Sequence, residues 1–332
     1  MKKIYNVVNS VKGGCGKTTL SVWLATYLNN QAVDLVKGNS CIIDMDLQGT
    51  ALVSLFYGSN DIDQNYHYLH EWIRGYQTKG TKFIQEICLE QDKKFSVVFA
   101  SPKQEDKNLF YSGARSNYSP IIEYGTFRLG ISRLLKNDDF CAHDFKHIIF
   151  DMPPNADGYS DSALECVLNP KYTAVEKDDT VNLFMMMTMD NSHMSATTDW
   201  LKELYAESNN SIPDQLFIVF NNNVISGHVE KDCVDFCKTK KNTIKEVLDK
   251  IQIPESKKDN IYFCVMNRNI GYSSACMDGK GLINYKKEEN GDLELGLDNV
   301  TFGYFSSYTN SEFVEMKPET FAKLLTGEYD GN

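Results

Sequence analysis

The stretch SVKGGCGKTT at residues 10–19 constrains the fold of this chain more than any other, because it holds three glycines and two lysines. The preceding residues, KKIYNVVN, have the short apolar pattern of a buried strand, and the following residues, KTTLSVWLATYLNN, have apolar side chains at helical spacing. A glycine-rich turn between a strand and a helix directs backbone N–H groups and the positive helix end to one point. The stretch therefore predicts an α/β fold with a phosphate-binding loop.

Part of this loop fits the P-loop pattern G-x-x-x-x-G-K-[ST]. Gly16, Lys17 and Thr18 match that pattern, whereas Val11 stands at its first glycine position. In the pattern the lysine reaches the β- and γ-phosphates, and the hydroxyl binds Mg²⁺. The departure at Val11 is followed by a second lysine, Lys12, ahead of the glycines.

The string KGGCGKTT resembles the deviant Walker A box, K-G-G-x-G-K-[ST], of the ParA/MinD/Soj group of ATPases. The resemblance implies that Lys12 is the signature lysine, which reaches across a dimer to the partner's nucleotide. It also implies that ATP contacts most of the loop, namely Gly13, Gly14, Cys15, Gly16, Lys17, Thr18 and Thr19. Beside Lys17, Cys15 could act as a redox sensor with a lowered thiol pKa. Because the family leaves this position variable and bound phosphates oppose a thiolate, we expect an inert side chain instead.

A second box, CIIDMDLQGTA at residues 41–51, reads as a buried strand that ends in Asp44 and Asp46. Carboxylates two residues apart lie on one face of a strand, at the edge where open α/β sheets bind ligands. The box resembles the D-x-D-P-Q-G switch I segment of the ParA/Soj branch, with Leu47 where proline is usual. The resemblance implies that Asp46 orients the attacking water and that Asp44 lies near Mg²⁺, with Gln48 and Gly49 completing the pattern.

A third box, HIIFDMPPNADG at residues 147–158, is another apolar strand, and it ends in Asp151. It resembles the Walker B and switch II box, D-x-P-P. The resemblance implies that Asp151 holds Mg²⁺ through water and that the Pro153–Pro154 pair stiffens the turn below the γ-phosphate. A carboxylate at a strand end can also serve only as a cap, but two such acids downstream of a P-loop favour the metal site.

Two later strands are expected to approach the nucleotide. QLFIVFNNN predicts a strand from Gln215 to about Asn221, and the resemblance places Asn221 near the adenine base, although asparagines also simply form turns. IYFCVMNRN then stands where the family has its P-R-N segment, with Met266 beside the nucleotide and Asn267 in place of the proline.

The order of these segments predicts a doubly wound, mostly parallel sheet flanked by helices, as in P-loop NTPases. The resemblance covers residues 1–285 as one ATPase domain, with a helical insertion at about 55–92. Residues 286–332 are expected to form an accessory hairpin, turning at Asn290–Gly291, and a terminal helix packed on the same domain. That helix is too short and too weakly basic for membrane anchoring, so we expect no membrane partner.

The residues of the three boxes are expected to carry out Mg²⁺-dependent ATP hydrolysis. Lys12 and Lys17 would supply positive charge, and Asp46 would orient water, because phosphoryl transfer needs mainly positioning and charge neutralisation. The resemblance implies a homodimer held together by ATP and released by slow hydrolysis, with a stimulating ParB-like or cargo-adaptor protein. Nine cysteines without a disulfide pattern predict a cytoplasmic protein.

Two questions about function stay open at this stage. A ParA-like partition protein would bind nonspecific DNA and associate with the nucleoid, and the best basic cluster for DNA is Lys238, Lys240, Lys241 and Lys245. The net charge of −11 and nearby acids also fit a solvated helix face. The alternatives are a switch that positions a protein machinery without DNA, or a metabolic or cofactor-assembly member of the superfamily. An iron–sulfur carrier is disfavoured because the chain has no C-x-x-C.

Overall fold

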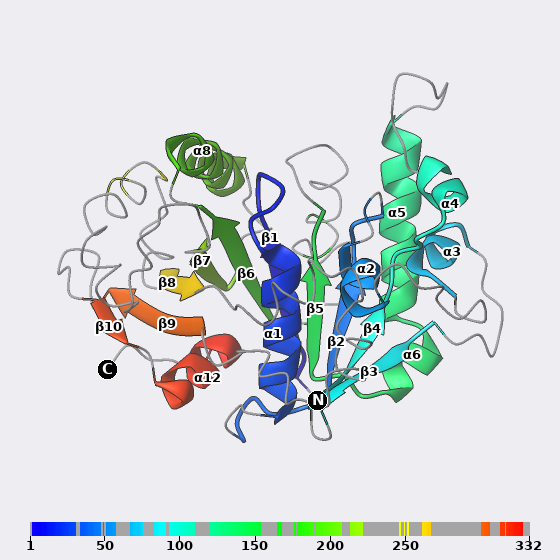
Figure 1. Cartoon of the computed structure of the whole chain (residues 1–332), viewed down its shortest axis with the longest axis horizontal. Coiled ribbons are helices and arrows are strands. Elements are labelled where there is room, and N and C mark those ends of the chain that lie inside the picture. The colour runs from blue at the N-terminus through cyan, green and yellow to red at the C-terminus, as the bar shows by residue number, and fades with distance from the viewer. Residues whose placement is uncertain are drawn as a thin grey trace.

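The fold is known from a computed structural model. It describes residues 2–30, 34–47, 49, 51–57, 67–75, 83–90, 93–109, 120–153, 165, 167, 176, 178–188, 190–207, 213–221, 246, 249, 251, 261–266, 300–305, 313–315 and 317–327. Within these residues, ten strands form one sheet with helices packed on it (Figure 1). No helix in the described part is long and apolar enough to cross a membrane.

The sheet has a parallel centre and antiparallel edges. Its order is β10-β9-β8-β7-β6-β1-β5-β2-β4-β3, and the seven strands from β8 to β4 run parallel to one another. Going along that order, the strands are β10 (Phe313–Glu315), β9 (Val300–Phe305), β8 (Ile261–Met266), β7 (Gln215–Asn221), β6 (Thr180–Met187), β1 (Ile4–Asn9), β5 (His147–Asp151), β2 (Ser40–Asp44), β4 (Lys93–Val98) and β3 (Gln85–Glu90). The strand that leads into the glycine loop, β1, is therefore central.

Alternating side chains of the central strand bury two separate cores. Ile4 and Val8 belong to one apolar cluster, and Tyr5 and Val7 belong to the other, because successive residues of a strand point to opposite faces. The first core packs against α1 (Lys17–Asn30), α2 (Ala51–Tyr57) and α12 (Pro318–Thr326). The second packs against α3 (Leu69–Ile73), α5 (Pro120–Leu135), α6 (Asp138–Ala142) and α8 (Asn191–Glu207). A further helix, α4, spans Gln104–Leu109. The doubly wound, mostly parallel fold expected from the sequence is confirmed.

One part of the sequence prediction is wrong. The segment 55–92 was expected to be a helical insertion, but its last described part is the strand β3, antiparallel to β4. The side chains of Gln85, Ile87 and Leu89 are buried, whereas Glu86 and Cys88 are exposed. This two-residue alternation is the pattern of a half-buried strand at the edge of a sheet. The helices α2 and α3 also fall within or near this segment.

The C-terminal hairpin and helix extend the same layers. The strand β9 pairs antiparallel with β8 and then with β10, so the hairpin continues the main sheet. The helix α12 begins with Pro318 and is capped at its C-terminal end by Gly327, whose backbone is in the left-handed conformation. Proline at the first position of a helix and glycine just after its last are common at helix boundaries. Phe321 of this helix packs against the rings of Trp23 and Phe217. The turn expected at Asn290–Gly291 lies outside the described residues.

A buried histidine at the start of β5 makes stability depend on pH. His147 donates through Nε2 to the carbonyl of Val36, and burial lowers the pKa of His147 to about 4. The unfolded chain regains a histidine pKa near 6.5, so it takes up the proton first. The free energy of unfolding should therefore decrease as the pH falls from about 6.5 to about 4, by about 3 kcal/mol for this side chain.

The measurement is urea unfolding of the native protein and of His147→Gln across this pH range. The amide of glutamine can still donate to Val36 but does not titrate, so the difference between the two curves isolates the histidine. We expect the difference in unfolding free energy between the two proteins to be constant above about pH 7. By pH 4 this difference should have changed by about 3 kcal/mol in favour of the variant. Parallel curves over the whole range would contradict a neutral buried imidazole.

Candidate nucleotide-binding site

The glycine loop joins β1 to α1 in a conformation that demands glycine. Gly14 and Gly16 have positive φ angles of 77° and 91°. A Cβ atom at Gly16 would lie 2.7 Å from Asn221 Nδ2 and 2.7 Å from Met266 Cε. Both the backbone angle and the close packing therefore exclude a side chain at Gly16. The backbone N–H groups at the start of α1 are left to face an anion.

Residues at the ends of β7 and β8 pack against this loop. Asn221 is buried and donates from Nδ2 to the carbonyl of Cys15 at 2.8 Å. Met266 is also buried and borders Gly16. The structure thus gives both residues a place against the loop, and their contact with an adenine base stays a prediction.

Gly16→Ala should abolish nucleotide binding because the added methyl group would displace the supporting side chains and strain the backbone. We expect affinity for a fluorescent ATP analogue to fall at least about 100-fold, with the fold retained, as judged by circular dichroism. Gly125→Ala is the matched control, since a Cβ there meets nothing within 4 Å. Wild-type affinity in Gly16→Ala would show that the loop does not bind the nucleotide.

Lys17 is nearly buried and is held inside the loop. Its side chain is 8% exposed, and its Nζ donates to Ser10 Oγ at 3.0 Å. Ser10 in turn donates to the carbonyl of Lys12 at 2.7 Å. The motif patterns did not single out Ser10, because a serine at a strand end has no distinctive spacing. A buried ammonium group among backbone N–H groups is a strong local attraction for phosphate.

Two buried carboxylates lie side by side at the edge of the sheet next to the loop. Asp44 ends β2 and Asp151 ends β5, and the two are register partners in neighbouring strands. Asp44 accepts hydrogen bonds from the N–H groups of Asp46 and Ala100 at 3.2 and 3.3 Å. Burial, with repulsion from Asp151 and Asp46, raises the pKa of Asp44 well above its ordinary value. Such a pair of carboxylates favours a cation between or beside them.

Asp151 accepts hydrogen bonds from side chains in the first two turns of α1. It accepts a hydrogen bond from Ser21 Oγ at 3.2 Å and a second from the side chain of Thr18. Burial raises the pKa of Asp151 to about 6, although Lys17 and these hydrogen bonds act in the opposite direction. The P-loop threonine and this carboxylate thus lie together, as a shared metal would require.

Asp46 lies at the same edge and is less buried than Asp44 or Asp151. Its Oδ1 accepts a hydrogen bond from the N–H of Gly49 at 2.8 Å. A Cβ atom at Gly49 would lie 2.0 Å from Asp46 Oδ2, so only glycine permits this approach. The expected pattern partner Gln48 lies outside the described residues.

A buried histidine fixes the backbone beside Asp46. His70 Nδ1 accepts from the N–H of Ser101 at 2.9 Å, and its Nε2 donates to the carbonyl of Leu47 at 3.0 Å. Burial lowers the pKa of His70 to about 4, so the ring stays neutral. Sequence patterns could not find this contact, because it joins a helix to two loops that only the fold brings together.

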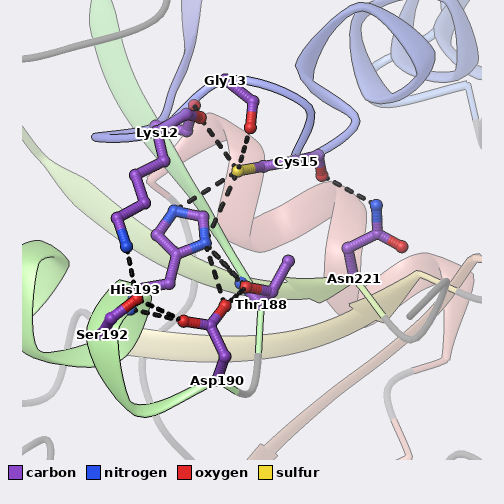
Figure 2. A network of polar contacts seen from close by, with 9 residues as sticks. Lys12, Gly13, Cys15, Thr188, Asp190, Ser192, His193 and Asn221 are labelled. Atoms are coloured by element: carbon purple, nitrogen blue, oxygen red, sulfur yellow. Dashed lines mark hydrogen bonds and ion pairs between the residues drawn. The ribbon is translucent and has the colours of Figure 1, made fainter. Parts of the chain in front are cut away.

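The side chain of Lys12 points away from the rest of the loop, to Ser192 in the first turn of α8 (Figure 2). Its Nζ donates to Ser192 Oγ at 2.5 Å, and Ser192 donates to Asp190 Oδ1 at 2.7 Å. The thiol of Cys15 donates to the carbonyl of Lys12 at 2.9 Å and lies 3.3 Å from His193 Nε2. Burial raises the pKa of the Cys15 thiol, which argues against the redox sensor.

Comparison with known families assigns the chain. The family described as the CobQ/CobB/MinD/ParA nucleotide binding domain matches residues 6–276. The chain belongs to this family. The matched range contains the glycine loop and all three carboxylates of the site. Comparison with curated protein sequences gives no significant match.

Solved structures of MinD/ParA-family proteins share the fold at low sequence identity. An ATP complex of McdA from Cyanothece has a TM-score of 0.51 at 16% identity, covering 89% of this chain and 94% of that chain. A Mg-ADP complex of MinD from Pyrococcus horikoshii has a TM-score of 0.50 at 14% identity, covering 98% and 95%. A ParA family ATPase from Chlorobium tepidum has a TM-score of 0.50 at 16% identity, covering 89% and 96%.

The residues of this site fit a Mg²⁺–nucleotide ligand. Among the described residues, no group of three or more His, Cys, Asp or Glu side chains is arranged to hold a metal alone. Mg²⁺ does not need such a group, because it usually keeps several waters and binds one or two carboxylates together with phosphates. Thr18, Asp44 and Asp151, which lie beside the loop, would supply that donor set.

Several predicted residues cannot be placed. The lysines proposed for DNA, which are Lys238, Lys240, Lys241 and Lys245, lie outside the described residues. The same holds for Pro154 and for the segment 267–269. Their roles remain predictions.

Proposed function

We propose that this MinD/ParA-family protein is a Mg²⁺-dependent ATPase that forms a homodimer with ATP and dissociates after slow hydrolysis. The observation that carries the proposal is the convergence of Lys17, Asp44, Asp46 and Asp151 around the glycine loop, with Lys12 outside them. The ATP and Mg-ADP complexes of the McdA and MinD structures support the choice of nucleotide and metal.

Each residue has a distinct task in this proposal. The loop N–H groups and Lys17 bind and neutralise the phosphates. Thr18, Asp44 and Asp151 hold Mg²⁺, which neutralises charge on the phosphates. Asp46, the most accessible of the three carboxylates, accepts a hydrogen bond from the attacking water and orients it. Because these groups only position and neutralise, they are sufficient for phosphoryl transfer to water.

Lys12 is proposed to act on the nucleotide of the partner subunit. In the same subunit, Lys17 already points into the loop, whereas the Lys12 side chain points to Ser192 of α8 (Figure 2). Lys12 is half-buried, but its ammonium contact with Ser192 is exposed to solvent, so the ammonium group can approach a second molecule that docks on the loop. Hydrolysis then requires dimerisation, so the protein works as a switch.

The cargo of such a switch is proposed to be DNA or a DNA-bound complex, with a ParB-like partner that stimulates hydrolysis. The net charge of −11 favours the second candidate, a switch that positions a protein machinery without binding DNA. ATP-dependent retention on DNA that weakens steeply with salt would support partition. Absence of retention at low salt would favour the protein machinery.

The proposed activity is tested by measuring phosphate release and molecular mass on the native protein with ATP. We expect slow phosphate release and a dimer with Mg²⁺, and the loss of both when EDTA removes the metal. A monomer with ATP and Mg²⁺ at all protein concentrations, without phosphate release, would overturn the proposal.

A further inference from the structure

His70 of α3 connects two loops that lie next to the carboxylates of the site. The side chain is fully buried, and burial keeps the ring neutral. The N–H of Ser101 donates to Nδ1 at 2.9 Å, so the ring must carry its proton on Nε2. That nitrogen donates to the carbonyl of Leu47 at 3.0 Å. The two ring nitrogens thus bind one loop each, in fixed acceptor and donor roles.

The contact with Leu47 acts on the backbone of Asp46. Leu47 directly follows Asp46 in the turn after β2, and its N–H donates to the carbonyl of Met45 at 3.0 Å. Leu47 also stands where the related segments usually have proline, whose ring would fix the backbone angle φ. In this chain the hydrogen bond from His70 holds that backbone from outside the turn.

The contact with Ser101 acts on Asp44. Ser101 directly follows Ala100, whose N–H donates to Asp44 Oδ2 at 3.3 Å. Because Ser101 is buried, its own N–H depends on the acceptor that His70 provides. His70 therefore fixes the peptide next to the one that binds the buried carboxylate.

The helix that carries His70 is closely packed and cannot follow the loops easily. Leu69 belongs to the second core, and its N–H donates to the carbonyl of Phe99 at 2.8 Å. A Cβ atom at Gly130 of α5 would lie 2.6 Å from Ile73 Cα, so the two helices are in close contact. A side chain on such a helix can fix the position of the loops that it binds.

We propose that His70 is a positioning residue for two carboxylates of the site. Through Nε2 it holds Asp46 in place to orient the attacking water, and through Nδ1 it holds Asp44 in place beside Mg²⁺. The assignment rests on the proposed function, in which Asp46 acts on water and Asp44 on the metal. The two contacts therefore have separate effects. Loss of the first should slow hydrolysis, and loss of the second should weaken the binding of Mg²⁺.

Two amide variants separate the contacts. In His70→Asn, Oδ1 takes the place of Nδ1 and can accept from Ser101, but the donor to Leu47 is lost. In His70→Gln, the amide nitrogen takes the place of the ring Nε2 and can donate to Leu47, but the acceptor for Ser101 is lost. His147→Gln is the matched control, because His147 is also a buried histidine that donates to a carbonyl, but it lies at the opposite end of β5 from Asp151.

The measurements are steady-state phosphate release, the lifetime of the ATP-bound dimer, and the binding of Mn²⁺ as a paramagnetic probe for the Mg²⁺ site. His70→Asn should lower kcat about 10-fold, the usual effect of losing one hydrogen bond that acts in the transition state, with native affinity for Mn²⁺. Because hydrolysis releases the dimer, its lifetime should lengthen by the same factor. A variant that was only less stable would not lengthen this lifetime.

His70→Gln should show the opposite division. Its affinity for Mn²⁺ in the presence of a non-hydrolysable ATP analogue should fall about 10-fold, with kcat near the native value at saturating Mg²⁺. The control His147→Gln should change neither quantity. Native kcat in His70→Asn together with native Mn²⁺ affinity in His70→Gln would overturn the proposal. Equal changes of the same quantity in both variants would also overturn it.

A measurement without nucleotide tests the hydrogen bonds alone. In ¹⁵N NMR spectra of the histidine side chains at pH 7, the signals that are lost in His70→Gln should be those of a neutral ring with its proton on Nε2. A ring with its proton on Nδ1, or a charged ring at that pH, would contradict the proposal.

The positioning role and the proposed function can fail separately. If the native protein hydrolyses ATP and needs Asp46, but neither His70 variant responds, only the assignment of His70 is wrong. If the native protein does not hydrolyse ATP with Mg²⁺, the proposed function fails, and the positioning of Asp46 by His70 fails with it.

Discussion

Replacing Lys12 with alanine is expected to lower the rate of ATP hydrolysis by at least about 100-fold, with ATP still bound. The loop and Lys17 bind the phosphates within one subunit, so the affinity for ATP should change little. The missing group is a cation that neutralises charge in the transition state, and loss of a comparable arginine in other phosphoryl-transfer proteins costs 10³–10⁵-fold. The measurement is steady-state phosphate release, together with binding of a fluorescent ATP analogue.

Lys37→Ala is the control for this experiment, because Lys37 is an exposed lysine just before β2, at the strand end opposite to Asp44. It should hydrolyse ATP at the native rate. If Lys12→Ala also hydrolysed at that rate, Lys12 would have no part in catalysis, and the deviant form of the loop would need another explanation.

Replacing Asp46 with alanine is expected to trap the ATP-bound dimer. Asp46 is more accessible than the other two carboxylates of the site, and in our account it orients water rather than Mg²⁺. Hydrolysis should therefore fall by about 100-fold or more, while ATP and Mg²⁺ still bind. Size-exclusion chromatography with ATP should show a dimer that persists for hours, whereas the native dimer decays as ATP is consumed.

Asp44→Ala provides the contrast to this variant. Asp44 is buried beside Asp151 and is proposed to hold Mg²⁺, so its loss should weaken binding of Mg²⁺–ATP and prevent the dimer. Should Asp46→Ala behave like Asp44→Ala, with no dimer, Asp46 would be a ligand-binding residue and the assignment of the water would be wrong.

The motifs indicated the candidate site because each one describes a short piece of chain with its own backbone geometry. The glycine loop, Asp44 and Asp151 each end a central parallel strand, and parallel strands bring their carboxyl ends to one edge. The sequence therefore predicted both the fold and the meeting of these groups. The prediction was wrong at β3, where a two-residue alternation of buried and exposed side chains was interpreted as part of a helical segment.

Contacts between distant segments could not be predicted in this way. Cys15 and His193 are 178 positions apart, and they meet only because β6 lies next to β1 in the sheet. The support of the loop by Asn221 similarly depends on the order of β6 and β7. No local pattern encodes a strand order, so these contacts follow from the fold alone.

The central claim is that the lysine and the aspartate of one active centre come from different subunits. It is tested most directly by mixing Lys12→Ala with Asp46→Ala, each inactive alone. In a mixed dimer, the nucleotide of the Lys12→Ala subunit meets its own Asp46 and the partner's Lys12, so one of the two sites is complete. If the two variants are combined before ATP is added, pairing is random and half of the dimers are mixed, so the initial hydrolysis rate should be about a quarter of the native rate. A mixture as inactive as its components would contradict the account.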